Sequence, residues 1–344
     1  ALIMFRGNDT LTVANVERRR EVLQTSHGIV VTDVRPGIGE VIVVVRRPKR
    51  AILSLPELWR RRQLPDTAPE LNGSFLIGER EDNGELLYLN IFSVNGDQPE
   101  HGPHTLIAGE TGGGKGILTR NILLDMLATN SPRNLRIRFV DPKRGADYRW
   151  LEKMPHLDGG IVSTQEEAIA TLQELVQEME SRYDKITATA PDIDAYNDQV
   201  DPSARLPRIF LFHDEVGDWM ADKSSGYPDA VSNYVVRLAS KARAAGVHLV
   251  LITQRPDKDA MPSQVKANVG NKICLRVSSG INSRIVLDEI GAEKLFGKGH
   301  FAAKLANEIP MGQSSLIFGQ VPYLDYKEAW KLAGEIADYW KGAG

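Results

Sequence analysis

A glycine-rich segment has the residue types of a phosphate-binding loop. It lies between an apolar run, 104–108, and a stretch of helical spacing that begins at Ile117. Glycines let backbone amides turn toward phosphate oxygens, the helix start adds partial positive charge, and a lysine can reach the β and γ phosphates. The segment therefore predicts a Walker A motif that binds ATP. Its residues are Gly109, Glu110, Thr111, Gly112, Gly113, Gly114, Lys115, Gly116 and Ile117.

The loop departs from the usual Walker A pattern at one position. Gly116 stands where a serine or threonine normally supplies a hydroxyl that helps to hold Mg²⁺. The metal would then be held by water, by phosphate oxygens and by a carboxylate elsewhere, with Thr111 nearby. We expect Mg²⁺ binding to be weakened rather than abolished.

Two adjacent acids follow an apolar strand candidate, 208–213, downstream of the loop. A carboxylate at a strand end can hold Mg²⁺ through water, and a second one can polarise the attacking water. We assign Asp214 to the metal and Glu215 to the role of general base. The competing interpretation is a pair of solvated acids, which is common at strand ends. His213 is expected to face a neighbouring residue rather than a ligand.

A further apolar strand candidate, 247–253, ends at Gln254. An amide side chain at that edge of the sheet could contact the γ-phosphate or the attacking water. Gln254 is therefore a candidate sensor of hydrolysis.

Composition and charge are those of an ordinary globular protein. Hydrophobic residues make up 42% of the 344 residues, and the formal net charge is -3, so a polyanion partner would need locally concentrated positive charge. The single cysteine, Cys274, excludes an intrachain disulfide and fits a reducing compartment, so we expect a cytoplasmic protein. The chain starts at Ala1, which leaves open a longer protein with a membrane segment outside this sequence.

The first part of the chain, residues 1–103, is expected to form a smaller β-rich subdomain. It contains a β-branched run at 41–45 and two apolar runs that flank Asn83 and Gly84, a pair that favours a hairpin turn.

From residue 104 to 344 the pattern changes to strands that alternate with helices. This alternation predicts an α/β fold with a mostly parallel sheet covered on both faces. A capping box formed by Ser163 and Glu166 begins the clearest helix, and the proline-containing segment 187–208 is expected to be a loop or insertion. The strand candidates are 104–108, 135–140, 208–213, 247–253 and 272–277.

Short motifs in this second part resemble the FtsK/SpoIIIE-type DNA translocase motor, of the FtsK–HerA branch of P-loop ATPases. They follow the order and spacing of that family. The motifs are Val-Asp-Pro-Lys at 140–143, Met-Pro-His-Leu at 154–157, Glu-Met-Glu-Ser-Arg-Tyr at 178–183, Ala-Tyr-Asn at 195–197, the segment 241–256 with its Leu-Ile-Thr-Gln-Arg-Pro ending, and the segments 265–268, 277–279, 283–284, 287–288, 291–295 and 297–299.

The resemblance implies a RecA-like core in a hexameric ring of identical subunits that threads double-stranded DNA, with ATP at each subunit boundary. Lys115 matches the Walker A lysine, Asp214 and Glu215 the Walker B pair, and Gln254 the strand-end glutamine of the family. An arginine of the neighbouring subunit is expected to complete the site. The candidates are Arg243 and Arg237, and after them Arg284, with a surface role as the alternative for each.

Four cations in loops at strand ends are candidates for contact with DNA. Such contacts would be to phosphates and would give grip without sequence information. Ordinary solvated loop residues are the alternative for each of Lys143, Arg144, Lys258 and Lys266.

Three functional classes remain for the chain. The sequence ends soon after Tyr339 and Trp340, without room for the winged-helix module of the chromosome translocases, so we expect a specialised translocase. Conjugation, mobile elements, secretion and restriction of foreign DNA are all compatible. The second class is a secretion or conjugation ATPase that moves protein. The third is an ATP-binding scaffold with little hydrolysis, against which Glu215 argues.

Overall fold

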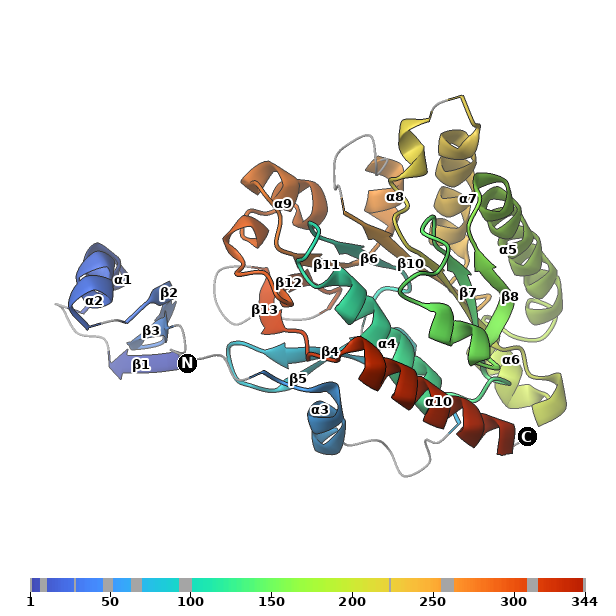
Figure 1. The fold of residues 1–344 in the computed structure, drawn as a ribbon, viewed down its shortest axis with the longest axis horizontal. Coiled ribbons are helices and arrows are strands. Elements are labelled where there is room, and N and C mark those ends of the chain that lie inside the picture. The colour runs from blue at the N-terminus through green and yellow to red at the C-terminus, as the bar shows by residue number, and fades with distance from the viewer. Residues whose placement is uncertain are drawn as a thin grey trace.

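One large mixed sheet forms the centre of the protein (Figure 1). The computed structural model describes residues 2–6, 11–27, 29–45, 52–62, 70–92, 101–222, 224–254, 263–307 and 315–342. Within these ranges, ten strands belong to this sheet and three to a second, smaller one.

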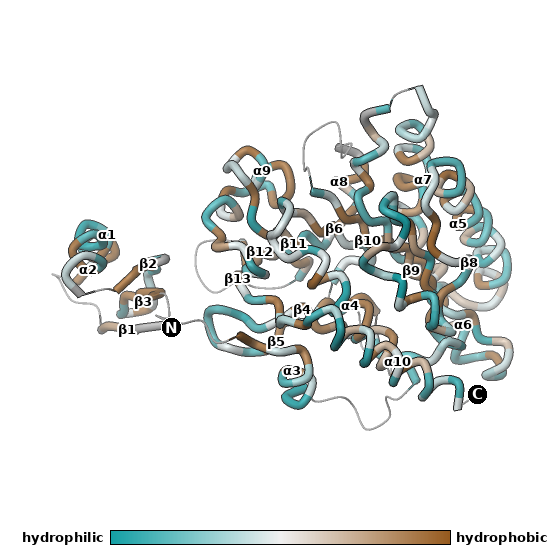
Figure 2. The backbone as a smooth tube through the Cα atoms, in the orientation of Figure 1, coloured by the Kyte–Doolittle hydropathy of each residue, from teal (hydrophilic) through white to brown (hydrophobic). Residues whose placement is uncertain are grey.

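Six neighbouring strands of the large sheet run parallel. They are β11 (Asn271–Leu275), β6 (Thr105–Ala108), β10 (Val247–Thr253), β9 (Arg208–His213), β7 (Leu135–Val140) and β8 (Leu157–Val162). Every residue of β6, β9 and β10 is buried, as expected for parallel strands with helices on both faces. Figure 2 shows the hydrophobic residues concentrated along these central strands. The predicted α/β fold with a mostly parallel sheet is confirmed.

Four antiparallel strands extend the sheet beyond β11. They are β12 (His300–Lys304), β13 (Ile317–Gln320), β4 (Ser74–Arg80) and β5 (Leu86–Asn90). The order across the sheet is β5-β4-β13-β12-β11-β6-β10-β9-β7-β8. The hairpin expected at Asn83 and Gly84 joins β4 to β5, and Gly84 has the positive φ, 76°, that such a turn uses.

Helices divide the interior into two cores, one on each face of the sheet. The first core receives residues from α3 (Leu55–Arg61), α4 (Lys115–Thr129) and α10 (Tyr326–Gly342). The second receives them from α5 (Gln165–Ile186), α7 (Tyr227–Lys241), α8 (Ser263–Asn268) and α9 (Gly280–Leu287). Strand residues alternate between the two, so that Phe210 faces the first core and Leu211 the second.

The small sheet has a core of its own. Its strands are β1 (Leu2–Arg6), β2 (Val31–Gly37) and β3 (Glu40–Val45), all antiparallel, and α1 (Val13–Arg18) and α2 (Arg20–His27) connect β1 to β2. Val16, Val31, Val34, Val41 and Val43 pack together in it. Strands β4 and β5 precede residue 103 in the sequence but belong to the large sheet, where β4 pairs with β13. The domain boundary expected at residue 103 stays a prediction.

Two local expectations differ from the structure. Helix α5 begins one residue later than expected, because Thr164 rather than Ser163 accepts the backbone hydrogen bond, from Glu167 at 3.3 Å. The segment 187–208 contains α6 (Ile193–Gln199), which Asp192 caps by accepting a hydrogen bond from the amide of Ala195 at 2.9 Å. Short 3-10 turns lie at Arg149–Lys153, Pro202–Ala204, Trp219–Ala221 and Ala292–Lys294.

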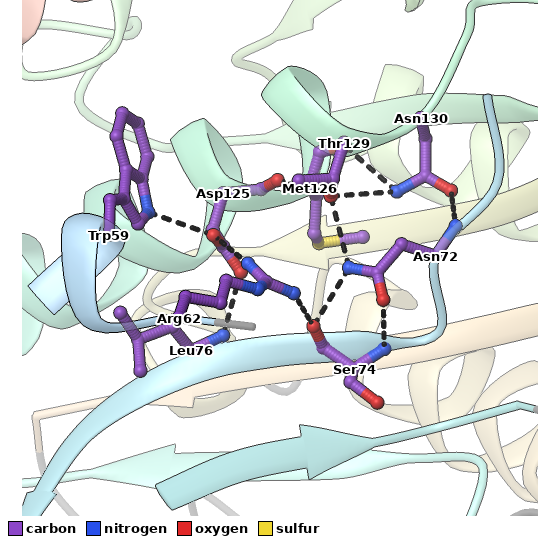
Figure 3. A network of polar contacts seen from close by, with 9 residues as sticks. All are labelled: Trp59, Arg62, Asn72, Ser74, Leu76, Asp125, Met126, Thr129 and Asn130. Atoms are coloured by element: carbon purple, nitrogen blue, oxygen red, sulfur yellow. Dashed lines mark hydrogen bonds and ion pairs between the residues drawn. The ribbon is translucent and has the colours of Figure 1, made fainter. Parts of the chain in front are cut away.

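A buried polar network joins α4 to the segment that precedes it in the sheet (Figure 3). The carboxylate of Asp125, on α4, pairs with the guanidinium of Arg62 and accepts hydrogen bonds from the Trp59 indole at 2.8 Å and the Leu76 amide at 2.7 Å. Both charged side chains are almost fully buried. A second group, Asn72 with Thr129 and Asn130, ties the start of β4 to the end of the same helix.

We expect Asp125→Ala to lower the free energy of unfolding by about 3–5 kcal/mol, because it leaves the buried guanidinium of Arg62 without its counter-charge. Urea denaturation measures the change. Asp198→Ala, at an exposed position of α6, is the matched control and should stay within about 0.5 kcal/mol of the parent. Equal stability of the two variants would contradict the importance of the network.

Candidate nucleotide-binding site

The glycine-rich loop lies between β6 and α4, at the carboxyl edge of the parallel strands (Figure 1). Gly114 caps α4 with a φ of 112° and without a side-chain hydrogen bond, so the first amides of the helix stay available to an anion. A Cβ at Gly114 would lie 2.8 Å from the backbone of Gly299, and the Gly299 amide donates to the Gly113 carbonyl at 2.8 Å. The segment 297–299 therefore packs directly on the loop.

Lys115 points back into its own loop. Its ammonium donates to the Gly109 carbonyl at 2.7 Å, and the residue is buried. Burial lowers the pKa of Lys115, while the nearby carboxylates of Glu215 and Asp214 oppose that shift. A phosphate that enters the loop offers this ammonium a charged acceptor in place of a neutral carbonyl, which favours binding of polyphosphate.

The two acids lie at the end of β9, next to the loop. Burial, together with the charges of Glu215 and Asp141, raises the pKa of Asp214 to about 7. Glu215 has a left-handed backbone with a φ of 50°, and its amide donates to the Asp214 carboxylate at 3.0 Å. The strained turn fixes both carboxylates at the sheet edge.

Gln254 connects the loop to the acids. Its side-chain oxygen accepts a hydrogen bond from the Thr111 hydroxyl at 2.6 Å, and its backbone amide donates to Glu215 Oε2 at 3.1 Å. Three residues that are far apart in the sequence, Thr111, Glu215 and Gln254, are thus joined by hydrogen bonds, while their roles stay predictions.

The space around Gly116 would admit a side chain. A Cβ there would have nothing within 4 Å, and the residue lies in the first turn of α4. Within the described residues, no group of three or more His, Cys, Asp or Glu side chains could hold a metal directly. The Asp214 carboxylate beside the loop fits a Mg²⁺ that keeps most of its water, binds nucleotide phosphates and reaches Asp214 through a water molecule.

The other candidate residues lie in different environments. Arg243 and Arg284 are exposed, and Arg237 donates to Glu180 at 2.8 Å. Lys266 donates to the Asp288 carboxylate at 2.7 Å, and Lys258 lies outside the described residues. Their predicted roles remain predictions, as does the DNA contact of Arg144, which is exposed.

Lys143 lies closer to the acids than its sequence position suggested. Its ammonium is 3.7 Å from Glu215 Oε1, so the side chain reaches the nucleotide site. His213, in contrast, is buried and bonds to the Tyr227 hydroxyl at 2.5 Å, and burial lowers its pKa to about 4. It faces a neighbouring residue, as interpreted from the sequence.

Two features of the site escaped the sequence interpretation. Arg276 follows β11, and its guanidinium lies 3.2 Å from the carboxylate of Glu110 in the loop. The sequence did offer a signal for Arg276, because this residue directly follows a strand whose carboxyl end lies at the same sheet edge as the loop. The contact between Gly299 and the loop could not be predicted in this way. It joins backbone to backbone, so apart from the two glycines at 297 and 299 no residue type indicates it.

The fold and the site together define a P-loop ATPase domain of RecA-like architecture. Residues 90–258 match the FtsK/SpoIIIE family model, so the chain carries a domain of the FtsK/SpoIIIE family. The resemblance noted in the sequence motifs is thereby confirmed.

Curated relatives agree with this assignment. The chain is 33% identical over 288 residues to DNA translocase FtsK of Listeria monocytogenes, which covers 81% of the chain and 35% of the relative. It is 34% identical over 315 residues to DNA translocase FtsK of Oceanobacillus iheyensis, which covers 89% and 38% respectively. The chain thus spans just over a third of the length of these relatives.

Solved structures share the fold at lower identity. The conjugation coupling protein TcpA of pCW3, in a monomer form with ATPγS, has a TM-score of 0.70 at 23% identity and covers 98% of the chain and 89% of its own. The cytoplasmic domain of the type VII secretion ATPase EccC of Thermomonospora curvata has a TM-score of 0.68 at 24% identity, over 83% of the chain and 34% of its own. In the part of the chain that the structure describes, no helix has the length and apolar character of a membrane span.

Mg²⁺ binding at the site is expected to weaken below about pH 7. Mg²⁺ requires the ionised carboxylate, and Asp214, with a pKa of about 7, gains a proton as the pH falls. The Mg²⁺ concentration for half-maximal ATP hydrolysis should rise about tenfold per pH unit below 7 and level off above 8. In Asp214→Asn only the protonation of ATP itself still changes with pH, so the part of the pH dependence that Asp214 contributes should disappear. A slope that is the same in both proteins would contradict the assignment.

Gly116→Ser is expected to lower the Mg²⁺ requirement several-fold, because it restores a hydroxyl ligand at a position with open space. Isothermal titration of Mg²⁺ with a bound ATP analogue measures the effect. Gly334→Ser, in α10 and also with open space around its Cβ, is the control and should leave the Mg²⁺ affinity unchanged. Weaker Mg²⁺ binding by Gly116→Ser would mean that the metal is held in another way.

Proposed function

We propose that this chain is the ATPase motor of a translocase that moves double-stranded DNA. The observation that carries the proposal is the direct connection among Thr111 of the loop, Gln254 and Glu215, which joins phosphate binding to a candidate base. The names of the relatives, DNA translocase FtsK, support DNA as the cargo.

In this proposal each residue of the site has one role in ATP binding or hydrolysis. Lys115 binds the β and γ phosphates, Asp214 holds Mg²⁺ through water, and Glu215 takes a proton from the attacking water. Mg²⁺, when bound, neutralises charge on the phosphates. Gln254 responds to the γ-phosphate, because its amide oxygen already bonds to Thr111 in the loop.

The motor would act as a hexameric ring with ATP at each boundary between subunits. An arginine from the neighbouring subunit would stabilise the transferring phosphoryl group. Arg243, exposed just after α7, is the first choice, and the exposed Arg284 follows it. Arg237 ranks below them, since it would have to leave its ion pair with Glu180.

The DNA would be held by phosphate contacts from cations at the sheet edge. Lys143 and Arg144 lie in the turn after β7, and Lys258 and Lys266 are the further candidates. Lys266 would have to leave Asp288 to take part. With a net charge of -3 over the chain, grip depends on these local cations rather than on the overall field.

The motor would serve a specialised system such as conjugation, a mobile element or DNA restriction. Two other functions are outcomes of the test below. An ATPase that moves protein would turn over independently of DNA, and an ATP-binding scaffold would bind tightly without turnover.

Linear duplex DNA should stimulate ATP hydrolysis by the wild-type protein several-fold. Glu215→Gln should keep ATP binding and lower kcat about 10²–10⁴-fold, because the amide cannot accept the proton. Lys115→Ala should instead lose nucleotide affinity, which a fluorescent ATP analogue measures. Normal hydrolysis by Glu215→Gln would remove Glu215 from the role of base, and an unchanged rate with DNA would exclude the translocase.

A further inference from the structure

Both oxygens of the candidate base are engaged in the structure. Glu215 Oε2 accepts the hydrogen bond from the Gln254 amide at 3.1 Å, and Oε1 faces the Lys143 ammonium at 3.7 Å. A general base must present an oxygen to the water that it deprotonates. The contacts with Gln254 and Lys143 therefore restrain the Glu215 carboxylate, on which ATP hydrolysis would depend.

The turn that carries Lys143 is fixed by a buried carboxylate. Asp141, at the end of β7, accepts hydrogen bonds from the amides of Lys143 at 2.9 Å and Gly145 at 2.8 Å. Arg144, between them, has a left-handed φ of 60°. Because the backbone is held in this way, the freedom of Lys143 resides in its long side chain.

The two partners differ in exposure, which decides which of them can leave. The Lys143 side chain is 51% exposed and that of Glu215 only 9%. The Glu215 amide is bonded to the Asp214 carboxylate, in a backbone with a φ of 50°. The carboxylate thus stays in the site, whereas the ammonium can swing into solvent.

We propose that Lys143 is a positioning residue that restrains Glu215 in the DNA-free subunit and releases it when a DNA phosphate takes its ammonium. The inference rests on the proposed function, since it requires Glu215 as base and DNA as partner. It assigns to Lys143 both the predicted DNA contact and a link from that contact to hydrolysis.

The strength of the pair suits such a release. An ion pair with a half-exposed lysine is weak, because water screens the charges and the side chain gains freedom on leaving. Duplex DNA presents closely spaced phosphates of the same charge as Glu215 and can compete for the ammonium. A fully buried pair would be held too firmly for this exchange.

The kinetic test compares ATP turnover with and without saturating duplex DNA. Lys143→Ala should raise DNA-free kcat about two- to fivefold and leave the DNA-saturated kcat and the KM for ATP unchanged, so that the stimulation ratio falls. Lys143→Arg should keep the ratio of the parent. Arg149→Ala, which removes an exposed positive charge from the same segment, is the matched control and should also keep it.

A binding test gives an independent readout. Coupling between two sites is reciprocal, so neutralising Glu215 should free Lys143 for DNA. Glu215→Gln should bind duplex DNA about two- to fivefold more tightly without nucleotide, and this gain should vanish in the Lys143→Ala background. Fluorescence anisotropy at fixed salt measures all four proteins of the cycle.

Three outcomes would overturn the inference. If Lys143→Ala keeps the stimulation ratio, or if the binding cycle shows no coupling, Lys143 does not link DNA to Glu215, while the proposed function stands. If Lys143→Ala loses both rates equally, Lys143 assists turnover directly and does not restrain the base. If wild-type turnover ignores DNA, the proposed function fails and the inference fails with it.

Discussion

The parallel pairing of five strands is the constraint on which the site depends. Because β11, β6, β10, β9 and β7 run in one direction, their carboxyl ends meet at one edge of the sheet. The register sets Thr253 beside Ala108 and His213 beside Val140, so the loop, the two acids and the Lys143 turn follow directly from strand pairing. The register is hard to shift because neighbouring residues such as Leu211 and Phe212 belong to opposite cores, so a one-residue slip would send each of them into the wrong core.

The phosphate-loop helix is also anchored at its opposite end. Asp125 and the pair Thr129 and Asn130 connect α4 to the segment around Arg62 and Asn72, which lies before the loop in the sequence. Replacing a buried ion pair by apolar residues is often neutral for stability, so we infer that this pair contributes to specific packing rather than to net stability. Directed hydrogen bonds to Trp59 and Leu76 fix how β4 meets α4. An apolar contact would tolerate several arrangements.

The central fold and the core of the site were predictable from sequence because their signals are local. Strands β9 and β10 follow from largely apolar runs, and β7 from apolar residues that alternate with Arg136 and Arg138. The acids directly follow β9, and the loop directly follows β6. Strand β8 escaped prediction because its Asp158, Gly159 and Gly160 resemble a turn and it lies at the edge of the sheet. The start of α5 was misplaced by one residue because Ser163 and Thr164 are both able to cap. The partner of Lys143 could not be predicted, since it depends on how far a flexible side chain reaches across two strands.

The seam between Gly114 and Gly299 makes the phosphate loop part of a stiff frame. The backbones of Gly114 and Gly299 are in direct contact there. The Gly299 amide donates to the Gly113 carbonyl, and the Val321 amide donates to the Gly299 carbonyl. The side chains of Leu275 and Gln320 pack beside this backbone contact, at Gly114 and Gly299 respectively. A shift of the loop on nucleotide exchange would therefore be passed through Gly299 to β12 and β13, and from there to the β4–β5 hairpin at the end of the large sheet.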